Sequence, residues 1–132
     1  TWSDLKTEIQ FSTEMVDVHL PGQVISDTIA HSRRFAKRDP PAASGGYLHH
    51  CDQIVYDDEK GTVDMIRGKP IVPDELYWCS MPAQFFEGID NHQPLLEWAK
   101  TINKEELFRH GGRPAKVVIV EMFTAILWLH MG

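Results

Sequence analysis

The change of hydrophobic period across Pro21-Gly22 constrains the fold of this chain more than any other feature of its sequence. Between residues 11 and 20, apolar residues recur at about every second position, which is typical of a half-buried strand. Between residues 23 and 36 they recur at helical spacing, and a basic run at residues 33–38 lies at the C-terminal end of this stretch, where a helix dipole favours cations. The pattern predicts a strand, a tight turn and a helix whose basic end is solvated.

Short β-like runs dominate the middle of the chain and are separated by turn residues. They cover residues 47–48, 54–56, 63–66 and 76–81, and the last run is the best candidate for a buried strand. A glycine-bearing loop then leads into a helix expected at about residues 95–102. The order β-α-β-β-β-α predicts an α+β, or mixed α/β, fold with a mixed sheet and packed helices.

Residues 115–131 are almost wholly apolar and are interrupted by Glu121. A membrane span needs about 20 apolar residues with few or no charges, so the pattern predicts no transmembrane span. We expect instead a helix that is buried or covered by a partner subunit, and an edge strand is the alternative. If nothing in the chain covers so large an apolar face, it marks an interface.

The overall composition limits the classes of function. The length of 132 residues fits one compact domain, and the net charge of -6 argues against nucleic-acid binding. Two cysteines do not make a disulfide framework; a bond between Cys51 and Cys79 and a buried free thiol both remain open. Because the first residue is Thr, we expect a processed product or a fragment of something longer.

The run His49-His50-Cys51-Asp52 contains metal-ligating residue types but does not predict a metal site. Neighbouring residues of a strand point to opposite faces, so only two of these four side chains could share one ion. The sequence also lacks a P-loop, a dinucleotide fingerprint and a nucleophile elbow. The residues alone therefore give no catalytic residue and no metal ligand.

Several short motifs, in this order, resemble the C-terminal domain of the 5'-nucleotidases, the metallophosphoesterase group that includes ecto-5'-nucleotidase and bacterial UDP-sugar hydrolase. The resemblance covers about residues 3–100, and residues 101–132 lie outside it. It suggests a 5'-nucleotidase C-terminal-like domain at 1–100 and a C-terminal extension, an apolar helix or strand, at 101–132. The motifs are Asp4-Leu5 with Phe11, residues 16–25, Gly45-Gly46-Tyr47-Leu48, residues 54–57, Gly68-Lys69-Pro70-Ile71, residues 73–77 and Gly88-Ile89-Asp90.

The resemblance implies that metal binding and nucleoside binding are carried out by two different domains. In that family an N-terminal calcineurin-like domain holds two divalent metal ions, and the C-terminal domain binds the nucleoside between two aromatic rings. The expected partners of this chain are therefore an N-terminal metallophosphoesterase domain, or another protein subunit through the apolar tail, and a nucleotide or nucleoside. The family resemblance also suggests an extracellular, periplasmic or membrane-associated location.

Carried over residue by residue, the resemblance gives four substrate-binding candidates. Phe11 is the first stacking ring, although a core role at the start of a strand is an open alternative. Thr13 stands where the family has Asn, Asp90 matches the family's loop, and His92 replaces the second Phe. The proline, glycine and asparagine of the family motif around Phe11 are absent, since the sequence there is Gln10-Phe11-Ser12-Thr13.

Three functions follow, in this order. The first is the substrate-binding half of a 5'-nucleotidase-like, metal-dependent phosphoester hydrolase, with the catalytic half absent from this chain. The second is a degenerate, non-catalytic domain that serves as an accessory or interaction subunit of a larger assembly. The third is a nucleotide-binding sensor without catalysis.

Overall fold

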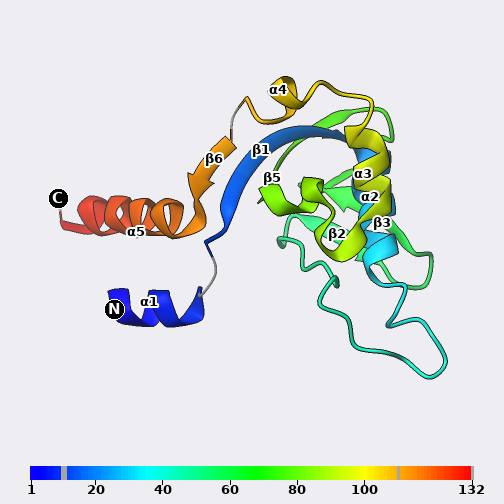
Figure 1. Ribbon diagram of the computed structural model, residues 1–132, viewed down its shortest axis with the longest axis horizontal. Helices are drawn as coiled ribbons and strands as arrows, with labels where there is room; N and C mark the ends of the chain where they lie inside the picture. Colours follow the sequence, from blue (N-terminus) through cyan, green and yellow to red (C-terminus); the bar gives the residue numbers. More distant parts are fainter. Residues whose placement is uncertain (10–11, 110, 132) are drawn as a thin grey trace.

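A computed structural model describes residues 1–9, 12–109 and 111–131 of the protein, and it contains two small antiparallel sheets with helices packed against them (Figure 1). One sheet has the strand order β5-β1-β6 and the other has the order β2-β3-β4. The elements, in chain order, are α1 (Trp2–Glu8), β1 (Glu14–Pro21), α2 (Gly22–Ser32), β2 (Ile54–Asp57), β3 (Thr62–Ile66), β4 (Lys69–Pro70), β5 (Leu76–Pro82), the 3₁₀ turns η1 (Ala83–Glu87) and η2 (Ile89–Asn91), α3 (Gln93–Ala99), α4 (Lys104–Leu107), β6 (Gly111–Pro114) and α5 (Ala115–Met131).

The strand and helix predicted around Pro21-Gly22 are confirmed as β1 and α2. Val16, Val18 and Leu20 of β1 are buried in alternation with more exposed residues, as the period of two predicts. β1 pairs along its length with β5, and α2 places Ile25 and Ile29 in the core. The helix ends at Ser32, earlier than predicted, and the backbone N–H groups of Arg33 and Arg34 instead form turn hydrogen bonds to the carbonyls three residues back.

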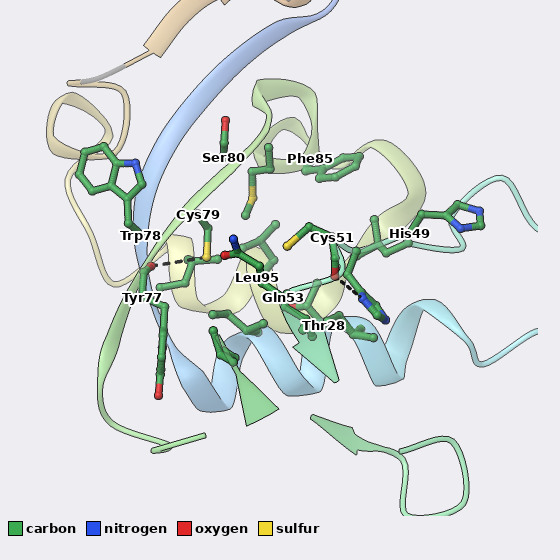
Figure 2. A pocket seen from close by; sticks show the side chains of 18 of the residues that line it. Thr28, His49, Cys51, Gln53, Tyr77, Trp78, Cys79, Ser80, Phe85 and Leu95 are labelled. Carbon is green, nitrogen blue, oxygen red and sulfur yellow. Dashed lines mark hydrogen bonds between the residues drawn. The ribbon is translucent and has the colours of Figure 1, made fainter. Parts of the chain in front are cut away.

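Helix α2 connects the two sheets. It follows β1 directly, and its Ser26 hydroxyl accepts a hydrogen bond of 3.0 Å from the backbone N–H of Val63 in β3. α2 also packs against α3. The two sheets are thus held on one helix, and residues of α2 line the space between the sheets (Figure 2).

The α+β class is confirmed, but three details of the prediction are wrong. All described strand pairs are antiparallel and form two sheets, so the single mixed sheet is not found. Residues 47–48 are irregular rather than a strand. β5 is an edge strand rather than a buried one, because it pairs only with β1 and leaves one face of the strand open to solvent, with Leu76 59% and Trp78 46% exposed.

The helix predicted in the tail is confirmed as α5, and no residue of it is buried in this chain. It follows β6, which pairs with β1 antiparallel. Figure 1 shows α1 and α5 on the same side of the molecule, away from α2 and α3. None of the helices in the described residues combines the length and hydropathy that a membrane crossing requires.

Candidate functional site

A cleft of about 1370 Å³ lies between β5 and the irregular segment that leads into β2 (Figure 2). α2 and α3 provide its base through Ile25, Ile29 and Leu95, which are buried core residues. Most of its lining is apolar or aromatic, and a few polar groups interrupt it. A concave, mostly apolar site with a few placed polar groups is typical of small-molecule binding. The lining includes Tyr47, Ile54, Ile66, Tyr77, Met81, Phe85 and, among polar groups, Gln53, Arg67, Lys69 and Asp90.

Asp90, one of the four predicted site residues, lines the cleft. It lies in η2 with φ of 59°, and its carbonyl oxygen accepts a 3.5 Å hydrogen bond from the Arg34 guanidinium. The chain at Gly46 approaches it closely, since a Cβ at Gly46 would lie 3.0 Å from the Cβ of Asp90. The glycine therefore allows this approach, and the Asp90 side chain remains exposed.

His92, the predicted second stacking ring, lies behind the cleft rather than in its lining. Its side chain is 0% exposed, and its ring meets Phe85 edge-on at 4.9 Å between ring centroids. Neither ring nitrogen has a hydrogen-bond partner among the described residues. The aromatic ring that this part of the chain presents to the cleft is therefore that of Phe85.

The environment of His92 makes the stability of the fold depend on pH. Burial lowers the pKa of His92, and the nearby His31 and Arg34 lower it further, whereas Asp90 opposes them. Burial and the charge of Arg34 likewise lower the pKa of His31.

Acidification is therefore expected to destabilise the folded protein. As the pH falls, these histidines are protonated in the unfolded chain before they are protonated in the folded one. Their contribution to the free energy of unfolding is therefore complete above the ordinary histidine pKa of about 6.5 and decreases as the pH drops below it. Urea unfolding at pH 7.5 and pH 5.5 measures the change. His92→Gln should flatten the dependence, and His49→Gln, at an exposed histidine, should not. An unchanged slope in His92→Gln would contradict this assignment.

The other two predicted site residues lie elsewhere. Thr13 is half-buried just before β1, and its carbonyl oxygen accepts a 2.8 Å hydrogen bond from the N–H of Ala115 at the start of α5. It is not part of the cleft lining. Phe11 lies outside the described residues, so its predicted role remains a prediction.

The run His49-His50-Cys51-Asp52 is exposed and irregular, and its first three residues line the cleft. Within residues 1–9, 12–109 and 111–131, no group of three or more His, Cys, Asp or Glu side chains is placed to hold a metal ion. The described residues therefore do not fit the metal centre of a two-metal hydrolase.

Sequence reasoning missed Arg33, which the basic run predicts to be solvated. Its side chain is 6% exposed and lies over the rings of Tyr47, at 4.8 Å, and Tyr56, at 4.1 Å. Its Nη1 donates to the Tyr47 hydroxyl at 2.5 Å and to the Asp58 carboxylate at 3.1 Å. Arg33 thus joins the end of α2 to the cleft wall and to the β2–β3 turn. No local pattern distinguishes it from the other basic residues of the run, of which Lys37 and Arg38 are exposed.

Comparison with known proteins supports the fold. No protein-family model matches the chain, and no curated protein sequence matches it. The solved structure of NAD nucleotidase from Haemophilus influenzae matches with a TM-score of 0.62 at 19% identity, over 76% of this chain and 20% of that chain. The chain thus spans about a fifth of the length of that protein. The match to part of a nucleotidase confirms the fold that the sequence resemblance predicts.

Proposed function

We propose that this chain is the nucleoside-binding part of a 5'-nucleotidase-like phosphoester hydrolase, and that the cleft between the two sheets receives the nucleoside. The observation that carries the proposal is the fold match, which covers most of this chain but only a fifth of a nucleotidase. A part of that size, with a large open cleft, suits a binding role better than a complete catalytic one.

The lining of the cleft offers groups that match a nucleoside. A flat base gains about 1 to 3 kcal/mol by stacking on an aromatic side chain, and Phe85 and Tyr47 are the rings that we propose for this contact. The Asp90 carboxylate is an acceptor for a base N–H or a ribose hydroxyl. Arg67 and Lys69, which also line the cleft, provide positive charge for a phosphate group.

The four residues carried over from the family take different roles in this proposal. Asp90 contacts the ligand, and His92 supports Phe85 from behind through its edge-on ring contact. Phe11 keeps the stacking role that the resemblance gives it, whereas Thr13, which lies outside the cleft lining, is given no ligand contact. The two divalent metal ions and the hydrolytic step belong to a separate N-terminal metallophosphoesterase domain.

Titration calorimetry with adenosine and AMP tests the binding role. The wild-type chain is expected to bind, and Asp90→Asn is expected to weaken binding about tenfold or more, because a hydrogen bond to a charged group is lost. Asn tolerates the positive φ of this position, so the fold should be kept. Asp27→Asn on the exposed side of α2 is the matched control, and it should leave the affinity unchanged. Equal affinities in Asp90→Asn and wild type would exclude Asp90 from the site.

The exposed helix α5 favours a second candidate, an accessory or interaction subunit. Most of its apolar side chains are exposed in the described part of the chain, and exposed apolar faces of this extent mark interfaces. The same titration separates the two candidates. If the folded wild-type chain shows no heat of binding with adenosine or AMP, the nucleoside-binding proposal fails, and the accessory role is the candidate that remains to be tested.

A further inference from the structure

Two thiols from opposite walls of the cleft face the same space. Cys79 lies in β5, opposite Val18 of β1, and Cys51 lies in the irregular segment that leads into β2. Both line the cleft, and Figure 2 shows both side chains directed into it. Both are free cysteines in this structure. Each wall of the cleft therefore presents one thiol to the shared space.

The two thiols differ in their accessibility. Cys51 is exposed, so a small oxidant reaches it from solvent. Cys79 is half-buried, and its thiol donates to the Tyr77 carbonyl at a distance of 3.5 Å. Burial and then the nearby Cys51 raise the pKa of Cys79 to about 11, while Arg67 opposes them. The effect of one thiol on the other agrees with their common place in the cleft.

The two walls are also attached differently to the fold. Cys79 is held in place by the pairing of β5 with β1, which runs from Met15↔Pro82 to Pro21↔Leu76. Cys51 lies outside both sheets, three residues before the first residue of β2. A shift of the Cys51 segment toward β5 therefore breaks no strand pairing, and it would bring the walls together while α2 keeps the sheets joined.

We propose that Cys51 and Cys79 form a disulfide under oxidising conditions, and that this bond closes the cleft by tying β5 to the segment before β2. With oxidised glutathione as the oxidant, the Cys51 thiolate attacks one glutathione sulfur and releases one glutathione thiolate. The Cys79 thiolate then attacks the Cys51 sulfur of the mixed disulfide and releases the second glutathione thiolate. The two protein thiols are oxidised, their two protons pass to the released thiolates, and one glutathione disulfide is reduced.

Intact mass measurement of the 132-residue chain, after incubation with oxidised glutathione and quenching with acid, tests the proposal. The expected product is about 2 Da lighter than the reduced chain, because two hydrogen atoms are lost. Digestion with trypsin without reductant should give a linked pair of peptides, residues 39–60 with residues 68–100. Dithiothreitol should restore the original mass.

Single variants identify the partners. Cys79→Ala should stop at a glutathione adduct on Cys51, about 305 Da heavier than the reduced chain, since the second thiol is missing. Cys51→Ser should show no mass loss of about 2 Da, because the remaining thiol has no partner. The proposal is overturned if the folded wild-type chain also stops at the glutathione adduct, or if it forms only dimers linked through Cys51. Circular dichroism of each variant verifies that it is folded, and the test does not depend on whether the cleft binds a nucleoside.

Discussion

Replacing Gly22 with alanine is expected to destabilise the fold by about 2 to 3 kcal/mol. A Cβ at this position would lie 2.5 Å from the carbonyl oxygen of Val72 and 2.9 Å from Cγ1 of Ile71. The backbone oxygen cannot move away freely, because Gly22 and Gln23 both donate N–H hydrogen bonds to the 73–75 segment, to Glu75 and Pro73, at 3.0 and 2.9 Å. The clash therefore opposes the contact that holds the start of α2 against the segment before β5.

Urea unfolding followed by circular dichroism measures this effect as a lower midpoint at an unchanged slope. Gly45→Ala is the matched control, because its Cβ would meet only an Asp90 carboxylate oxygen at an ordinary 3.8 Å. We expect that control to change stability by less than about 1 kcal/mol. If Gly22→Ala unfolds at the wild-type midpoint, the segment before β5 does not lie as close to α2 as described here.

Replacing Arg33 with alanine is expected to cost about 2 to 4 kcal/mol of stability. The change removes the guanidinium that lies over Tyr47 and Tyr56 and leaves the Tyr47 hydroxyl without its 2.5 Å donor. It also opens a space in a buried position at the end of α2. Because Tyr47 lines the cleft, the loss of the Arg33 guanidinium also removes a support of one wall of the candidate site.

Thermal and urea unfolding of Arg33→Ala, with Arg38→Ala as the control, measures this cost. Arg38 is exposed and lies over Phe35, so we expect its replacement to change stability by less than about 1 kcal/mol. Arg33→Lys should be intermediate, because lysine keeps the charge but lacks the planar group that lies over both rings. Equal stabilities for the Arg33→Ala and Arg38→Ala proteins would show that Arg33 has no structural role beyond that of a surface cation.

The sequence was sufficient for elements with a clear hydrophobic period. β1 and α2 are examples, because one period ends and the other begins at Pro21-Gly22. The β2–β3 hairpin is another, since its turn residues separate two short apolar runs. The helix α1 carries a local signal that the prediction did not use: Thr1 and Asp4 form a capping box.

Long-range contacts explain what sequence patterns did not predict. β6 contains two glycines and a proline, which have low strand propensity, and it is a strand only because it pairs with β1. Arg33 looks like its basic neighbours, and only the approach of Tyr47 and Tyr56 buries it. The family motif predicted Asp90 as a site residue. Phe85 was not predicted, because no motif in the sequence marks it.

Mapping the amide chemical shifts of the ¹⁵N-labelled chain during titration with adenosine tests the central proposal most directly. We expect saturable shifts, with one dissociation constant, for residues that line the cleft, above all Tyr47, Phe85 and Asp90. Residues of α5 should not move. An unshifted spectrum at millimolar adenosine, or shifts confined to α5 or to the outer face of β2, would contradict a nucleoside site between the two sheets.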